Sequence, residues 1–195
     1  MDTLLNFTGG LDSTYCLYDH LTKPDHSKLL VHHCRIVNKE NRAKYEDRAI
    51  ADVLTWMRNN VSKNFEYVET EFHHPFSGYL PFDAQIVAFM TGVILRQPEY
   101  SGLKYTIGPL IRDETERLGR RLNRRWENEK LIRQCLSRKN LVVLRPAEHM
   151  KKTELWDALP RELARLTFSC RKPDKIVANN RCGECHTCKQ LAGRW

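Results

Sequence analysis

Apolar and polar positions follow two different periods along the chain. Short apolar runs and period-two alternation predict strands, whereas apolar positions three or four residues apart predict helices. On this basis we expect strands at Leu4–Phe7, Lys28–Ile36, Phe65–Phe72, Tyr105–Gly108 and Leu141–Leu144. We expect helices at Ser13–Thr22, Ala43–Arg58, Ala84–Leu95, Glu114–Arg138 and Thr153–Leu159. The helix at Ala84–Leu95 is almost wholly apolar, so we expect it to be buried.

The order of these elements predicts the fold class. Strands that alternate with helices are typical of an α/β fold, in which an open, mostly parallel sheet carries helices on both faces. No repeat, low-complexity segment or linker divides the sequence. We therefore expect one α/β domain over residues 1–168, with a tail of residues 169–195 packed on the same domain.

The charge indicates what kind of partner to expect. The formal net charge of the 195 residues is +8, which favours anionic partners such as nucleotides, phosphates or nucleic acid. Arginines recur at helical spacing over residues 117–125, and this pattern fits either a solvated helix face or a phosphate or RNA contact. No apolar stretch is long enough to span a bilayer, and the amino terminus lacks the pattern of a signal peptide. We expect a cytoplasmic protein without a membrane contact, in the host cytoplasm if the gene is viral.

A glycine-rich turn follows the first predicted strand, in the segment LLNFTGGLDSTYCL. Gly9 and Gly10 allow the backbone to approach a phosphate closely, and the N–H groups at the start of the next helix would point at that anion. Thr8, Ser13 and Thr14 add hydroxyl groups. Asp12 would repel a phosphate unless it binds a magnesium ion or caps the helix. A strand-to-helix turn with a cap and no ligand is the alternative.

This turn lacks the GK[ST] ending of the P-loop and the spaced glycines of a dinucleotide site. It resembles the SGGxDS signature of the PP-loop ATP pyrophosphatases, with Thr8 in place of the first serine. The resemblance implies a loop that holds the phosphates of ATP while the α-phosphate is attacked to form an adenylated substrate. The residues it assigns to ATP binding are Phe7, Thr8, Gly9, Gly10, Leu11, Asp12, Ser13, Thr14, Tyr15, Cys16 and Leu17.

The seven cysteines fall into two groups. Cys16, Cys34 and Cys135 are isolated, and we expect them to be small core residues. The other four lie within the last 26 residues, at Cys170, Cys182, Cys185 and Cys188. Four thiolates at these spacings are typical of a closed, structural zinc site. An iron–sulfur cluster, a redox thiol pair and unliganded cysteines are the alternatives.

A PP-loop followed by this cysteine tail resembles QueC, the 7-cyano-7-deazaguanine synthase family. The likeness continues at Pro146, Lys152, Glu154, Thr167 and Ser169, before the first cysteine of the tail, and at Tyr105–Gly108 with Asp113. It implies that ATP and Mg²⁺ activate the carboxylate of 7-carboxy-7-deazaguanine, that ammonia forms the amide, and that a second activation forms the nitrile. Asp12, Ser13 and Lys152 are then the candidate catalytic residues.

Two segments depart from the pattern of the QueC family. Cys34–Lys39 and Leu80–Gln85 stand where family members carry residues of the substrate pocket, and the chain is short for the family. A ligase that stops at the amide or acts on another carboxylate therefore remains an alternative. A PP-loop tRNA-modifying enzyme and a non-catalytic nucleotide-binding zinc protein are two others. An exposed face on the helix at Ala84–Leu95 would be compatible with a homodimer.

Overall fold

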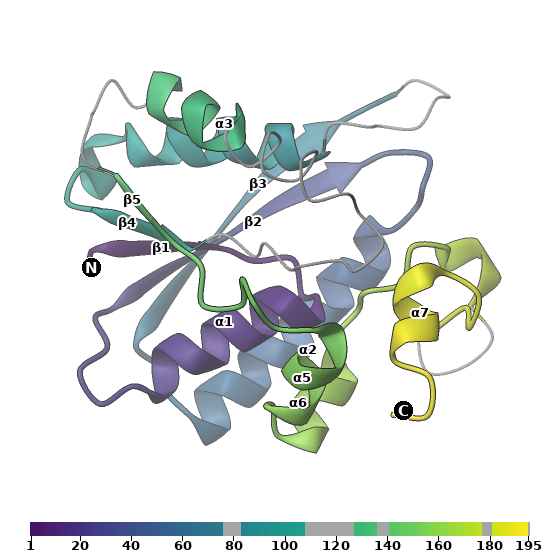
Figure 1. Cartoon of the computed structure of the whole chain (residues 1–195). Coiled ribbons are helices and arrows are strands. Elements are labelled where there is room, and N and C mark those ends of the chain that lie inside the picture. Colours follow the sequence, from purple (N-terminus) through teal and green to yellow (C-terminus); the bar gives the residue numbers. More distant parts are fainter. Residues whose placement is uncertain (76–82, 108–126, 136–140, 177–180, 195) are drawn as a thin grey trace.

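The sheet is parallel throughout the residues that the computed structural model describes, which are 1–75, 83–107, 127–135, 141–176 and 181–194. Its strands are β1 (Thr3–Asn6), β2 (Leu29–Val37), β3 (Phe65–His73), β4 (Tyr105–Ile107) and β5 (Val142–Leu144). They lie in the order β3-β2-β1-β4-β5 (Figure 1). The chain thus builds outward from β1 to β3 and then returns to the other side of β1. The strand order reverses between β1 and β4.

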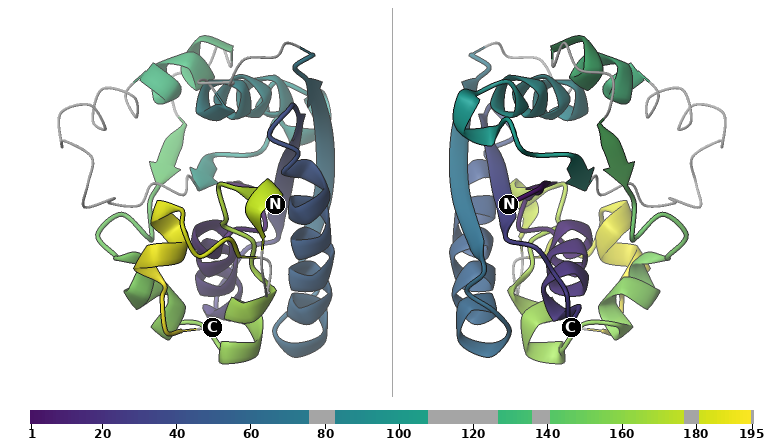
Figure 2. Two further views of the ribbon diagram at one scale, coloured as in Figure 1. Left: turned by 90° about the vertical axis from the view of Figure 1, so that its right-hand side faces the viewer. Right: turned by 90° about the vertical axis from the view of Figure 1, so that its left-hand side faces the viewer.

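Helices cover both faces of this sheet (Figures 1 and 2). One face carries α1 (Leu11–Thr22), α2 (Ala43–Asn60), α5 (Lys152–Asp157) and α6 (Arg161–Leu166). The opposite face carries α3 (Asp83–Leu95) and the helical residues 127–135. Short 3-10 helices occupy Pro98–Tyr100 and Pro173–Lys175, and α7 (His186–Gln190) lies in the tail. Across the described helices, none combines the length and the apolar character needed to cross a membrane.

The alternation of side chains along the strands produces two hydrophobic cores. Leu5 and Val31 pack with α1, α2, α5 and α6 on one face, whereas Leu4 and Leu30 pack with α3 on the other. Successive strand residues point to opposite faces, so a central strand needs apolar or well-paired residues at every position. All four residues of β1 are buried accordingly. The α/β class expected from the sequence is confirmed.

Several details differ from the sequence-based expectations. α1 begins at Leu11 rather than Ser13, which brings Asp12 into its first turn. Neither α6 nor α7 was predicted, because each is only five or six residues long and its apolar pattern covers barely one turn. The expectation that the whole of α3 is buried is wrong, because Phe89 is 48% exposed.

Some sequence predictions lie outside the described residues. These are the arginine-rich stretch at 117–125, Gly108 and Asp113, and part of the divergent segment at 80–85. The long helix expected at Glu114–Arg138 is described only at residues 127–135, which are helical.

Candidate functional site

The turn between β1 and α1 requires glycine at its first position. Gly9 has a φ of +65°, which side chains other than glycine rarely adopt. A Cβ atom there would also lie 3.0 Å from Ile50 Cγ1 and 3.1 Å from the Ile50 nitrogen. At Gly10 a Cβ would lie 3.3 Å from both Thr8 Oγ1 and Ser169 Oγ. The loop backbone therefore lies directly against α2 on one side and the segment before the cysteine tail on the other.

The hydroxyl of Ser13 fixes the shape of this loop from inside. Ser13 Oγ accepts the backbone N–H of Thr8 at 3.2 Å and donates to the carbonyl oxygen of Gly10 at 3.1 Å. Ser13 is 1% exposed. Thr14 is also buried, whereas Thr8 and Asp12 line the neighbouring cavity. The predicted ligand-binding loop thus has a buried serine as its internal brace and two polar side chains at its open side.

Asp12 and Lys152 form an ion pair that joins the two ends of the sequence. Lys152 Nζ donates to Asp12 Oδ1, although 140 positions separate the two residues. Lys152 is the first residue of α5, and Asp12 lies in the first turn of α1. Two of the three candidate catalytic residues therefore meet beside the loop.

A cavity of about 340 Å³ opens beyond the carboxyl ends of the central strands. In an open α/β sheet, ligands bind outside these ends where the strand order reverses, as it does here between β1 and β4. The volume is within the range of small-molecule sites. The walls come from four strands (β1, β2, β4 and β5), from α1, α2, α3 and the helical residues 127–135, and from the loop after β2 and the tail. Polar lining residues include Asn6, Thr8, Asp12, Asn38, Glu40, Arg42, Glu46, Asp83, Thr106, Asn128, Glu129 and Arg171.

Each acidic residue among these described lining residues has a basic partner, although two of them share one arginine. Asp12 pairs with Lys152, Glu129 with Arg145, and Asp83 with Arg171 at 3.8 Å. Glu46 and Glu40 share Arg42, at 2.5 and 3.8 Å. An incoming anion therefore meets bases that are already positioned by carboxylates, rather than an uncompensated acidic surface.

A buried chain of hydrogen bonds lies under the cavity. Thr91 Oγ1 donates to Asn6 Oδ1 at 2.9 Å, and His32 Nδ1 lies 3.2 Å from the same oxygen. His32 Nε2 lies 2.8 Å from Thr70 Oγ1. Because an amide oxygen only accepts, the network assigns the proton of neutral His32 to Nδ1. Burial is the main cause that lowers the pKa of His32 to about 4, and the charge of nearby His33 contributes to the same shift.

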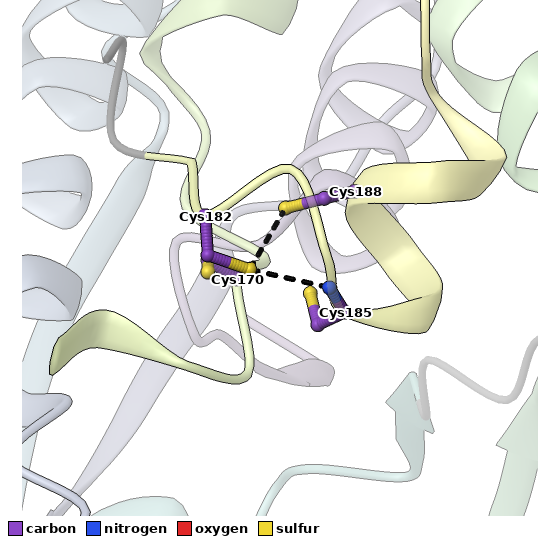
Figure 3. A group of neighbouring side chains, drawn as sticks. All are labelled: Cys170, Cys182, Cys185 and Cys188. Carbon is purple, nitrogen blue, oxygen red and sulfur yellow. Dashed lines mark hydrogen bonds between the residues drawn. The ribbon is translucent and has the colours of Figure 1, made fainter. Parts of the chain in front are cut away.

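The four tail cysteines meet in one buried group (Figure 3). Their sulfur atoms all lie within 4.8 Å of one another, and the Sγ atoms of Cys182 and Cys188 are 3.9 Å apart. Backbone N–H groups of Cys185 and Lys172 point at the sulfurs of Cys182 and Cys170, at 3.2 and 3.4 Å. This group is able to hold a metal ion.

The electrostatics of the cysteine cluster favour a bound cation. Burial raises the pKa of Cys170 and raises the pKa of Cys188 to about 12. Burial also opposes ionisation of Cys182, but N–H donors from Cys185 and Glu184 lower its pKa to about 7. Several neighbouring thiols become thiolates together only when a positive charge shares the site.

The size of the group distinguishes between kinds of metal centre. Zinc–sulfur bonds of about 2.3 Å place the sulfurs of a tetrahedral site about 3.8 Å apart. In a cubane cluster each thiolate binds a different iron, which separates the sulfurs by roughly 6 Å. The observed sulfur separations fit a single ion.

Other residues of the predicted nucleotide segment lie in the core. Phe7, Leu11, Cys16 and Leu17 belong to the larger hydrophobic cluster, and Tyr15 packs against it. Their side chains hold α1 on the sheet, which leaves the backbone of the loop to face a ligand. Burial raises the pKa of Cys16 to about 12.

The sequence analysis found part of the cavity wall and missed the rest. The segments expected at the substrate pocket, Cys34–Lys39 and Leu80–Gln85, contribute Asn38 and Asp83. The analysis did not expect Glu40 and Arg42 from the loop after β2, or Asn6 at the end of β1. The rule that ligands lie beyond the carboxyl ends of parallel strands would have found them. Cys34, expected to be a core residue, is buried but also lines the cavity. Arg171 reaches the cavity from the tail, a proximity that only the folded chain reveals.

No family model matches the sequence, and a search of curated proteins finds no relative. Among solved structures, the chain is similar to the U34-tRNA thiolase NcsA from Methanococcus maripaludis, described with its [4Fe-4S] cluster. The TM-score is 0.51 at 15% sequence identity, over 85% of this chain and 56% of the thiolase. The chain thus spans little more than half the length of that protein. At this identity the likeness establishes a shared α/β fold.

Proposed function

We propose that the protein is an ATP-dependent carbon–nitrogen ligase of the QueC type. The observation that carries this proposal is the meeting of the glycine turn, the amino terminus of α1 and the Asp12–Lys152 pair beside one cavity. The α/β fold shared with a U34-tRNA thiolase is compatible with an enzyme of this kind.

Each part of the loop has a role in the proposed reaction. The first N–H groups of α1 and the positive end of its dipole stabilise the phosphates of ATP. Lys152 transfers its hydrogen bond from Asp12 to the phosphate oxygens and stabilises the charge that develops during attack. Ser13 keeps the loop in the required shape through its bonds to Thr8 and Gly10.

The chemistry turns a poor leaving group into a good one. A carboxylate oxygen of the acceptor attacks the α-phosphorus of ATP, and pyrophosphate leaves. Ammonia then attacks the acyl carbon, AMP leaves and a proton is lost, which yields the amide. For the nitrile, the amide oxygen attacks the α-phosphorus of a second ATP and pyrophosphate leaves. Loss of AMP from carbon and of two protons from nitrogen then forms the carbon–nitrogen triple bond.

The donor atoms present fit two metal ions. Asp12 offers the hard carboxylate oxygen that Mg²⁺ prefers, and Mg²⁺ bound with ATP would neutralise phosphate charge. Cys170, Cys182, Cys185 and Cys188 offer a closed set of four sulfurs with the separations of a zinc site. Zn²⁺ there would hold the tail against the loop.

The acceptor proposed for the cavity is 7-carboxy-7-deazaguanine, with ammonia as the second reactant. Amide and carboxylate side chains from Asn6, Asn38, Glu46 and Asn128 offer donors and acceptors to a flat heterocycle. A ligase that acts on another carboxylate, or that stops at the amide, has the same loop and cavity. A homodimer remains part of the proposal, since α3 exposes Phe89.

A tRNA-modifying enzyme is the second candidate, because the similar structure is a tRNA thiolase. A thiolase that uses a cysteine would need a reactive thiol near the nucleotide, and burial raises the pKa of both Cys16 and Cys34. The sulfur separations in the tail also fit a single ion better than a [4Fe-4S] cluster. We therefore favour the ligase over an enzyme that binds nucleic acid. A protein that binds nucleotide and zinc without turnover is the third candidate.

Product analysis tests the proposal. The protein is incubated with ATP, Mg²⁺, ammonia and 7-carboxy-7-deazaguanine, and products are identified by mass spectrometry. We expect the amide and the nitrile with the wild type and neither with Asp12→Ala. The amide alone would identify a ligase that stops halfway. Absence of both products, with wild type and Asp12→Ala behaving alike, would reject the ligase, and salt-sensitive tRNA binding would then favour the second candidate.

A further inference from the structure

The segment Thr167–Cys170, here called the connecting segment, lies between the cysteine cluster and the glycine turn. Its last residue, Cys170, is one of the four clustered cysteines. The backbone N–H of Phe168 donates to the carbonyl oxygen of Gly9 at 2.9 Å. One short stretch thus contacts the metal-binding group at one end and the predicted phosphate loop at the other. Figure 1 shows the tail on the side of the molecule where α1 begins.

Ser169 makes the most specific of these contacts. Its Oγ accepts the backbone N–H of Leu11, the first residue of α1, at 3.0 Å, across 158 positions of sequence. Gly10, which occupies the N-cap position, has no side chain that could accept this bond. Helix starts usually receive such a cap from the residue just before the helix. Here the cap comes from the residue that precedes a metal-ligand candidate.

Two side-chain contacts help to hold the connecting segment in place. The ring of Phe168 stacks on Tyr45 at 5.3 Å and belongs to the same apolar cluster as the four cysteines. The carbonyl oxygen of Thr167 accepts a bond from the buried guanidinium of Arg181 at 2.9 Å, next to Cys182. The first contact is made to α2, whereas the second belongs to the fold of the tail. In a group that gathers four cysteines, that fold depends on bound metal.

We propose that Ser169 is a positioning residue that couples metal binding in the tail to the geometry of the phosphate loop. Metal holds Cys170, Cys170 fixes Ser169, and Ser169 holds the first amide of α1 in place. Without metal, the Leu11 N–H loses its bond to Ser169, and the Ser169 side chain no longer packs against Gly10. The loop then samples conformations that do not fit ATP. The link to ATP rests on the proposed function, but the link between Ser169 and the loop does not.

Amide exchange measured by NMR tests the link within the protein itself. In the metal-loaded protein without nucleotide, Ser169→Ala should speed exchange of the Leu11 N–H roughly three- to tenfold, the effect of one lost hydrogen bond. Ser169→Thr, which keeps the hydroxyl, should restore the wild-type rate. The Asn64 N–H, which donates to Ser62 Oγ in the turn before β3, is an internal reference and should change little. Equal Leu11 exchange in the wild type and Ser169→Ala would overturn the proposal.

Metal removal tests the direction of the coupling. Chelation should speed Leu11 exchange in the wild type and add little in Ser169→Ala, because the cap is already absent. If the metal-free wild type keeps the circular dichroism spectrum and the Leu11 exchange rate of the metal-loaded wild type, the coupling is overturned. If chelation unfolds the chain, the comparison of metal-loaded Ser169→Ala with the wild type decides.

Calorimetric titration with ATP and Mg²⁺ separates this inference from the proposed function. Metal-loaded Ser169→Ala should retain the wild-type metal content and bind ATP roughly three- to tenfold more weakly. Ser62→Ala is the matched control, because Ser62 Oγ accepts the N–H of Asn64 at 3.0 Å in the turn before β3. If the wild type does not bind ATP, the proposed function fails and the exchange data still decide the role of Ser169. Wild-type ATP affinity in Ser169→Ala would overturn its positioning role.

Discussion

At the scale of single residues, the site depends on a few side chains that hydrogen bonds and ion pairs hold in place. Lys152 reaches Asp12 from the other end of the sequence, and its side chain is 15% exposed. A lysine held in this way near the amino terminus of α1 adds a full positive charge to the partial charge of the helix end. Since Asp12 holds the ammonium group, Lys152 is preorganised for an incoming phosphate.

Replacement of Lys152 by alanine should lower the rate of ATP-dependent AMP formation about 100-fold, the usual cost of losing one preorganised donor in an active site. Steady-state kinetics check this. Lys104→Ala is the control, because Lys104 is exposed next to the amino-terminal end of β4. A Lys152→Ala enzyme with the rate of the control would remove Lys152 from the mechanism.

His32 predicts a pH dependence of stability. Its pKa is about 4 in the folded protein because it is buried, against about 6.5 when unfolded. The unfolded state therefore binds more protons between these values, and stability falls as the pH drops through this window. Between pH 7 and pH 5 the wild type should lose about 2 kcal/mol more unfolding free energy than His32→Gln. Urea denaturation at the two pH values measures this, with surface His73→Gln as control. Equal losses in the wild type and His32→Gln would contradict the assignment.

At the scale of elements, the sequence predicted what periodicity can encode. The five strands were expected within one or two residues of their positions, because buried β1 and alternating β3 carry clear patterns. The short helices α6 and α7 were missed, since so few residues do not establish a period. The exposure of Phe89 was missed for another reason. An apolar helix sequence does not show which of its faces meets the sheet.

Because α3 packs closely against the helical residues 127–135, one methyl group added at Gly92 should destabilise the fold. A Cβ on Gly92 would overlap the Cβ of Cys135 and lie 3.2 Å from the carbonyl oxygen of Ile132. Overpacking costs about 1–3 kcal/mol, which exceeds the gain of about 1 kcal/mol when alanine replaces glycine in a helix. Gly92→Ala should therefore lower the unfolding free energy by up to about 2 kcal/mol.

Chemical denaturation checks this expectation. Gly102→Ala is the matched control, because the nearest atom to a Cβ there is the Met1 carbonyl oxygen at 3.9 Å. A Gly92→Ala protein more stable than the wild type would show that the two helices separate at no cost.

At the scale of the molecule, the candidate site joins segments that the sequence keeps far apart. The glycine turn and the cysteines were visible in the sequence because each has a local spacing rule. The rest of the cavity wall was not, because Asn6, Glu46 and Arg171 share no local pattern and meet only when the sheet folds. The bond from Ser169 to Leu11 was invisible for the same reason.

The most direct test of the central claim is the identity of the nucleotide that the protein releases from ATP. The reaction with 7-carboxy-7-deazaguanine, ammonia and Mg²⁺ is followed by chromatography and ³¹P NMR, with Lys152→Ala and Lys104→Ala alongside. Cleavage at the α-phosphate predicts AMP and pyrophosphate, formed only when the carboxylate is present and strongly reduced in Lys152→Ala. Release of ADP and phosphate, or tight ATP binding without AMP formation, would contradict the adenylating ligase.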